Sequence, residues 1–158
     1  MNVVIYSRVS SQSARQSTDR QVADLQKLAA DRGYTVCAVF EEKISGCKAI
    51  DERPVLLGCL DFCTDAQNHV DMLLVTEVSR LGRSTLEMLK ALDMLHKHKV
   101  SVYIQSLNIE TLLPDKTVNP LSSLITTLLG ELAAMERQNI LDRLNSGRAL
   151  YIQKGGRL

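Results

Sequence analysis

The sequence predicts an α/β fold, with a mainly parallel central sheet flanked by helices and a long C-terminal helix. Three observations support this prediction. Short β-rich segments alternate with segments of helical periodicity, a pattern typical of parallel sheets with crossover helices. The chain has 158 residues, enough to bury one hydrophobic core. Its last part carries an apolar stripe over roughly 30 residues, far above the mean helix length of about 11–12.

The first strand is expected over residues 2–6, followed by a polar loop over residues 7–15. A helix is then expected to open at Thr18, because Thr18 and Gln21 have the spacing of a capping box. Gly33 is the expected end of this helix, since glycine tolerates the left-handed backbone found at many helix ends.

Residues 35–40 are rich in β-branched and aromatic side chains and form the expected second strand. A loop is expected over residues 41–52. Asp51 is the expected N-cap of the next helix, with Pro54 in its first turn, where a missing N–H costs nothing.

The third and fourth strands are expected over residues 71–75 and 100–104. Between them, Ser84 and Glu87 form a second capping box that opens another helix.

The pattern changes at Asn119, which divides the chain into an expected α/β core over residues 1–118 and a long helix over residues 119–158. A helix of this length extends beyond a small domain, so part of its apolar stripe should need a partner. The stripe comprises Leu121, Leu124, Ile125, Leu128, Leu132, Met135, Ile140, Leu141 and Leu144.

The net charge is only +1, which does not suggest strong DNA binding by this chain alone. Positive charge is concentrated at the end of the chain, where residues 136–158 carry a net charge of +3. This segment is expected to face a polyanion, although a solvated helix face would also explain the charges. No apolar run approaches the ~18 residues of a membrane span, so no membrane partner is expected.

The four cysteines form no CxxC pair and are interpreted as free thiols, consistent with a reducing cytoplasm. They are Cys37, Cys47, Cys59 and Cys63. Neither the cysteines nor the three histidines suggest a metal site or a catalytic triad.

Two loops that follow strands carry residues suited to phosphate chemistry. Along the first extended segment, Tyr6, Arg8 and Ser10 should point to one side, which places a hydroxyl beside a cation. The second loop carries Arg80 and Arg83 just before a helix N-terminus, itself a natural anion site. Sites in parallel sheets form at the carboxyl ends of strands, so these loops should meet.

A phosphodiester fits these groups, because arginine forks match phosphate oxygens and remain charged. Phosphoryl transfer needs mainly positioning and charge stabilisation, and arginines can supply both. The sequence has no carboxylate cluster for Mg²⁺, no HExxH and no Walker-type loop, so neither a metal nor a nucleotide cofactor is expected.

These residues resemble the resolvase/invertase family of serine recombinases, and the similarity covers nearly the whole chain. The run Tyr6-Ser7-Arg8-Val9-Ser10 resembles the nucleophile segment, and Gln21 resembles an active-site glutamine. Ser45-Gly46 with Glu52-Arg53-Pro54 resembles the mobile loop that delivers another arginine, here Arg53. Ser79-Arg80-Leu81-Gly82-Arg83 resembles the paired-arginine motif, and Glu136-Arg137 through Gly147-Arg148 resembles the long helix for dimerisation and DNA contact.

The resemblance implies site-specific DNA recombination without a cofactor. Ser10 would attack the scissile phosphate and leave a 5′-phosphoserine link and a free 3′-hydroxyl, while Arg8, Arg80, Arg83 and Arg53 hold the phosphate. One departure stands out: many relatives carry an aspartate immediately before the first arginine of the pair, whereas this chain has Ser79.

The resemblance also implies double-stranded DNA as partner, a homodimer, and a tetramer in the synaptic complex, all in the cytoplasm. The residues expected to contact DNA are Arg137, Arg143, Arg148, Lys154 and Arg157. Relatives carry a separate DNA-binding domain after the long helix, which we expect to be absent from this chain.

Two other interpretations remain open. A non-catalytic α/β regulatory or dimerisation module would explain the core and the long helix but not the arginines. A serine-dependent phosphohydrolase would share the site chemistry but would not need the long helix.

Overall fold

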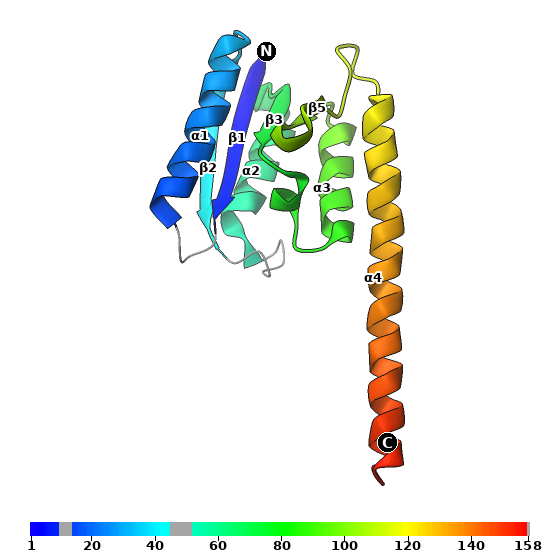
Figure 1. Cartoon of the computed structure of the whole chain (residues 1–158). Coiled ribbons are helices and arrows are strands. Elements are labelled where there is room, and N and C mark those ends of the chain that lie inside the picture. Colours follow the sequence, from blue (N-terminus) through cyan, green and yellow to red (C-terminus); the bar gives the residue numbers. More distant parts are fainter. Residues whose placement is uncertain (10–13, 45–51, 158) are drawn as a thin grey trace.

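The structure of this protein is a computed structural model that describes residues 1–9, 14–44 and 52–157. Five strands form one sheet in the order β2-β1-β3-β4-β5. The strands β1 (Asn2–Val9), β2 (Thr35–Lys43), β3 (Met72–Val75) and β4 (Ser101–Ile104) pair in parallel, and β5 (Ile109–Glu110) pairs antiparallel with β4. The predicted fold class is confirmed (Figure 1).

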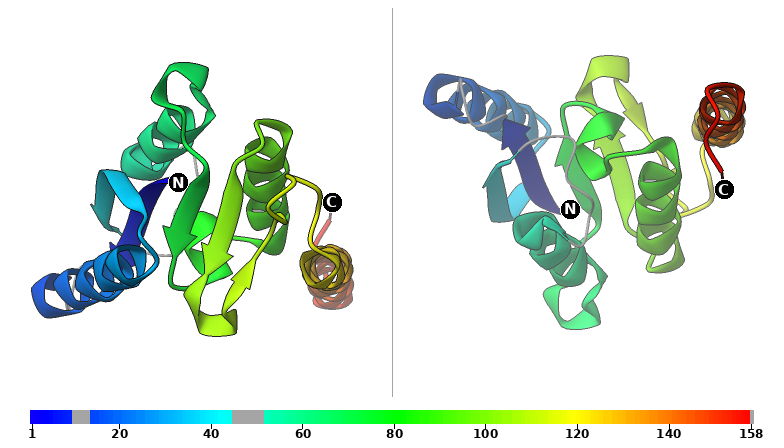
Figure 2. Two further views of the ribbon diagram at one scale, coloured as in Figure 1. Left: turned by 90° about the horizontal axis from the view of Figure 1, so that it is seen from above. Right: turned by 90° about the horizontal axis from the view of Figure 1, so that it is seen from below.

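Helices cover both faces of the sheet, as Figure 2 shows. On one face, α1 (Ala14–Asp31) packs Val22, Leu25 and Ala29 against β1 and β3. On the other face lie α2 (Pro54–Thr64) and α3 (Thr85–Lys97), whose buried leucines pack against the same strands. The inner strands are buried on both sides, which is typical of parallel sheets with helices on each face.

The first strand is longer than predicted, because it continues through Ser7 and Arg8 to Val9. These polar residues stay extended since β2 is also longer than predicted and offers paired partners, with Arg8 opposite Glu42. The loops predicted over residues 7–15 and 41–52 are therefore partly wrong.

Two predicted helix starts also need correction. The helix α1 begins at Ala14, so the pair formed by Thr18 and Gln21 lies inside the helix and does not open it. The N-cap of α2 is Arg53, whose side chain makes no capping hydrogen bond, while the predicted cap Asp51 lies outside the described residues.

Other predicted helix ends are confirmed. Gly33 has φ +70°, and the N–H groups of Gly33 and Tyr34 donate to the carbonyls of Ala30 and Ala29, which is the Schellman pattern. Ser84 caps α3 by accepting from the Glu87 N–H. The Glu87 carboxylate completes the turn by accepting from the Arg83 N–H at 2.8 Å, one residue earlier than a capping box requires.

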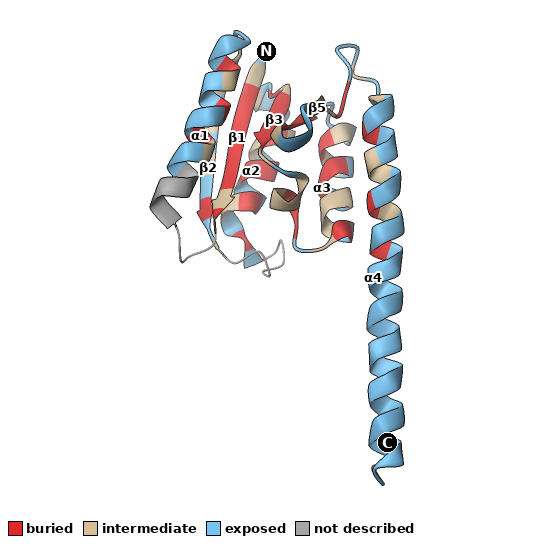
Figure 3. Ribbon diagram, in the orientation of Figure 1, coloured by how far each residue is buried: buried red, intermediate tan, exposed pale blue. Residues whose placement is uncertain are grey.

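The long helix α4 (Pro120–Gln153) begins after the N-cap Asn119, as predicted. Its buried residues Ser122, Leu129 and Ala133 lie in its first half, where it packs beside α3. From position 134 to position 155 every residue is exposed, and this part of the helix extends away from the rest of the molecule (Figure 3).

Candidate active site

Three of the predicted arginines meet at the carboxyl end of the sheet. Arg8 lies on β1, and Arg80 lies on η3 (Val78–Leu81), a short 3-10 helix that follows the neighbouring strand β3. Partial burial lowers the pKa of Arg8, and the positive charges of Arg80 and Arg53 lower it further. The three guanidiniums are therefore close enough to repel one another, and an anion placed among them would relieve that repulsion.

Arg53 lies at the centre of a buried polar network. Its side chain is fully buried, and its Nε forms an ion pair with Glu42 Oε2 at 3.2 Å. Its Nη2 donates to the Tyr6 hydroxyl at 2.5 Å and to the backbone carbonyl of Arg80 at 2.6 Å. Arg53 thus joins β1, β2 and the start of α2 to the loop that carries the paired arginines.

Glu42 and Tyr6 complete this network. The Tyr6 hydroxyl donates to Glu42 Oε2 at 2.5 Å. Burial raises the pKa of Tyr6, and the Glu42 hydrogen bond raises it further, so the hydroxyl stays protonated and can remain a donor. Glu42 is buried like Tyr6, and among the described residues it is the carboxylate that pairs with the arginine cluster.

Sequence reasoning missed Glu42 because it placed this residue in a loop. The available signal was alternation: Val36, Ala38, Phe40 and Glu42 are the less exposed positions of β2, and their neighbours are exposed. A strand prediction carried three residues further would have turned Glu42 toward the same side as Phe40.

Two donors of the cluster are not used within the described structure. Arg8 Nη1 donates to the Ile44 carbonyl at 3.2 Å, but the buried Arg8 Nε and Arg53 Nη1 have no hydrogen-bond partner there. Buried polar groups are nearly always paired in folded proteins. Unpaired donors beside converging guanidiniums are suited to an anion with several acceptor oxygens, such as a phosphodiester.

The second arginine of the pair, Arg83, is exposed on the same loop. Leu81 and Gly82 separate it from Arg80, and Gly82 has φ −179°, an extended conformation open to any residue. The space around Gly82 is restricted instead, because a Cβ there would lie 2.7 Å from Glu87 Cβ and 2.8 Å from the Met88 nitrogen. Glycine therefore lets the loop approach α3 closely.

The structure does not bring every predicted residue into the cluster. Ser10 lies outside the described residues, directly after Val9 at the end of β1. Gln21 is half-buried on α1, and its Oε1 is buried without a partner in the described parts of the chain.

The described residues contain no group of three histidine, cysteine, aspartate or glutamate side chains that could hold a metal ion. Among these same residues, no helix has the length and apolar character that crossing a membrane requires. Cys37, Cys59 and Cys63 are free thiols, and Cys47 lies outside the described residues.

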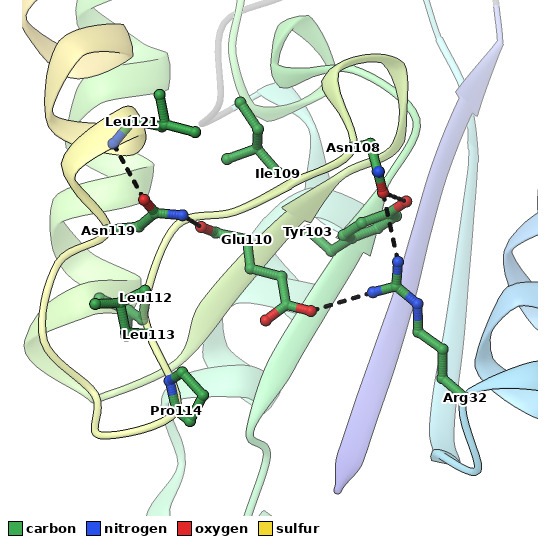
Figure 4. A pocket seen from close by; sticks show the side chains of 10 residues that line it. All are labelled: Arg32, Tyr103, Asn108, Ile109, Glu110, Leu112, Leu113, Pro114, Asn119 and Leu121. Carbon is green, nitrogen blue, oxygen red and sulfur yellow. Dashed lines mark hydrogen bonds and ion pairs between the residues drawn. The ribbon is translucent and has the colours of Figure 1, made fainter.

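A hollow of about 310 Å³ lies elsewhere, between the end of α1, β5 and the start of α4 (Figure 4). Arg32 lines one side of it, stacks 4.7 Å above the Tyr103 ring and pairs with Glu110 at 3.1 Å. Asn119 donates to the Glu110 carbonyl at 2.8 Å, which fixes the chain where α4 begins. None of the clustered arginines lines this hollow, so we assign it a structural role.

Comparisons with known proteins give the family of this chain. The family described as "Resolvase, N terminal domain" matches residues 3–157. A resolvase from Clostridium perfringens is 31% identical over 145 residues, covering 92% of this chain and 69% of that protein. The chain belongs to the resolvase family of serine recombinases.

Solved structures agree with this assignment. The N-terminal catalytic domain of TP901-1 integrase matches with a TM-score of 0.68 and 27% identity, covering 87% of this chain and 98% of that one. A resolvase family site-specific recombinase from Streptococcus pneumoniae shares the fold, with a TM-score of 0.76, 21% identity and 98% of both chains covered. Site-specific DNA recombination by strand exchange is the activity of this family.

In this recombinase most of the apolar stripe of α4 points away from the α/β core, although Ile125 packs against it. Leu121, Leu128 and Leu144 are 58%, 54% and 56% exposed, whereas Leu129 is buried against the core. Leu129 packs on the core beside the smaller Ser122 and Ala133, whereas the wider leucine face of α4 is left uncovered. The predicted DNA-contacting residues are also exposed on α4 or directly after it: Arg137, Arg143, Arg148, Lys154 and Arg157.

Proposed function

We propose that this chain cleaves and rejoins double-stranded DNA through a covalent link between Ser10 and a DNA phosphate. The observation that carries this proposal is the convergence of Arg8, Arg53 and Arg80 at the carboxyl end of β1. In the sequence, Ser10 follows Arg8 by two residues. A serine next to guanidiniums with unused donors is suited to attack a phosphodiester, because the cations balance charge on the non-bridging oxygens.

In the proposed reaction, the Ser10 oxygen bonds to phosphorus and the bond from phosphorus to the 3′ oxygen breaks. Ser10 loses its hydroxyl proton, and the 3′ oxygen gains a proton to become a free hydroxyl. The 5′ phosphate stays on Ser10 until a 3′-hydroxyl attacks it and releases the serine. One phosphoester replaces another at each step, so the reaction needs no nucleotide.

Arg8, Arg80 and Arg83 would bind the phosphate, since guanidinium forks fit two of its oxygens at once. For Arg53 we propose a positioning role in the described conformation. Its Nη2 holds the Arg80 carbonyl at 2.6 Å, and its ion pair with Glu42 fixes it below the surface. For Gln21 we propose a place beside the bound phosphate, where its amide NH2 group would donate to a phosphate oxygen and its buried, unpaired Oε1 would accept from a hydroxyl.

We further propose that residues 1–118 form the catalytic unit and residues 119–158 the helix for dimerisation and DNA contact. The exposed leucines of α4 would pair in a homodimer, and two dimers would form the synaptic tetramer. Such a stripe on a helix that has left its own core needs an apolar partner. The exposed arginines and lysines from Arg137 to Arg157 would contact DNA phosphates, and recombination would take place in the cytoplasm.

The test is a search for protein covalently attached to DNA. Supercoiled DNA carrying the sequences that flank the gene is mixed with the protein, quenched with denaturant, and adducts are mapped to a peptide. The attachment is expected at Ser10, lost in Ser10→Ala and kept in the neighbouring variant Ser11→Ala. Undiminished adduct in Ser10→Ala would refute the proposal. Unchanged activity of a folded Arg8→Ala variant would refute the role of the arginine cluster.

A further inference from the structure

The loop of the paired arginines contains a hydrogen-bonded pair that the proposed reaction does not use. The Ser79 hydroxyl donates to Glu77 Oε2 at 3.0 Å. Ser79 directly precedes Arg80 on η3, and Glu77 is the N-cap of the same short helix.

This hydrogen bond changes what Ser79 can offer to its surroundings. A serine hydroxyl has one proton to donate and lone pairs that accept. Because the proton is committed to the Glu77 carboxylate, the Ser79 oxygen is left as an acceptor, with a negative charge directly behind it. A serine without Glu77 could turn its proton outward and act as a donor instead.

The paired arginines have more donors than the nearby side chains accept from in the described residues, where Arg80 Nε donates to Thr76 Oγ1 at 3.4 Å. Arg80 and Arg83 each present five N–H donors, of which a phosphate uses about two in a bidentate contact. The other nearby carboxylates are engaged elsewhere: Glu42 with Arg53 and Tyr6, and Glu87 with the Arg83 backbone N–H.

We propose that Glu77 is a positioning residue of this recombinase, acting through Ser79. The pair presents at position 79 a negatively polarised acceptor, as an aspartate there would with its own carboxylate. That acceptor would take an N–H of the paired arginines that the phosphate leaves unused and would hold the guanidinium in its binding orientation. This inference rests on the proposed function, because the arginines are assumed to bind the scissile phosphate.

The experiment measures the initial rate of covalent adduct formation in the assay described for Ser10. In Glu77→Gln the neutral amide no longer fixes the Ser79 proton, and the rate is expected to fall about 10- to 100-fold, the range for loss of a charge-assisted hydrogen bond. Ser79→Ala should fall by a similar factor. The double variant Glu77→Gln/Ser79→Ala should be no slower than either single variant, since both remove the same acceptor.

The decisive variant is Ser79→Asp in two backgrounds. Combined with Glu77→Gln, it supplies the acceptor directly and should restore the rate to within about threefold of the wild type. Alone, it places two carboxylates where a hydrogen bond of 3.0 Å now lies, so it should be slower than the double variant. A structural role alone would not produce this reversal of effect between the two backgrounds.

Exposed Glu41 provides the matched control, because Glu41→Gln makes the same change of charge on β2 without altering the pair. Melting temperatures of all variants should agree within about 2 °C, as for ordinary surface changes. A Glu77→Gln rate within twofold of the wild type, or no rescue by Ser79→Asp in a folded double variant, would overturn the inference alone. Absence of any adduct with the wild-type protein would overturn the proposed function and this inference with it.

Discussion

Replacing Glu42 by glutamine tests whether the buried network supports the fold as well as the site. The change keeps the shape of the side chain but removes the charge that faces Arg53. The two groups are 3.2 Å apart, with 3% and 0% of their side chains exposed, so solvent screens the ion pair very little. Arg53 would be left buried and charged beside Arg8 and Arg80.

The expected loss follows from this burial. Removing one partner of a buried ion pair costs about 3–5 kcal/mol, because the remaining charge is uncompensated. A chain of this size loses roughly 2–4 °C of melting temperature per kcal/mol, which gives an expected decrease of roughly 6–20 °C. The amide also cannot accept as strongly from the Tyr6 hydroxyl, so the Arg80 loop should be less well held.

Equilibrium urea unfolding followed by circular dichroism measures the free energy, and differential scanning calorimetry measures the melting temperature. Glu41→Gln is the control, since Glu41 neighbours Glu42 on β2 but is exposed and should change the free energy by less than about 0.5 kcal/mol. Equal stabilities for the two variants would refute the reasoning. Such a result would mean that the Glu42–Arg53 pair contributes nothing net to the folded state.

Two further predictions concern the loop after η3 and the acid stability of the core. Gly82→Ala should lower stability by about 1–3 kcal/mol and slow adduct formation, because the new Cβ would overlap the Met88 backbone; unchanged urea unfolding would contradict this. Burial lowers the pKa of His96 below its usual 6.5. Below about pH 6.5 the unfolded chain therefore binds more protons than the folded chain, and the free energy of unfolding decreases as the pH is lowered. His96→Asn should lessen that loss between pH 7.5 and 5.5 in urea titrations, and an unchanged pH dependence in this variant would contradict the prediction.

The order of strands and helices could be predicted because periodicity and capping residues are local signals. Asn119, Ser84 and Gly33 act within one helical turn of themselves, and all three lie where predicted. The polar end of β1 could not be predicted in this way. Ser7 and Arg8 are extended because β2 pairs with them, a contact between residues 34 positions apart.

One part of the candidate site could be predicted from the sequence, and another part could not. Arg8 and Arg80 follow strands whose carboxyl ends meet in any parallel sheet, so their convergence follows from topology. The burial of Arg53 does not follow from topology. It depends on the side chains of Glu42 and Tyr6 meeting across neighbouring strands and within reach of the residue before Pro54, which only the packed structure reveals. The two-residue β5 is too short to give a periodic signal.

The free half of α4 has a mechanical consequence. At 1.5 Å per residue, the exposed stretch from position 134 to Gln153 is about 30 Å long, comparable to nine base pairs of a duplex. A tilt of about 10° where the helix leaves α3 would displace its far end by about 5 Å. The length of the helix therefore amplifies small rotations. A slight change in how Leu129 and Ala133 pack on the core would move the basic end of α4 by more than the spacing of one base pair.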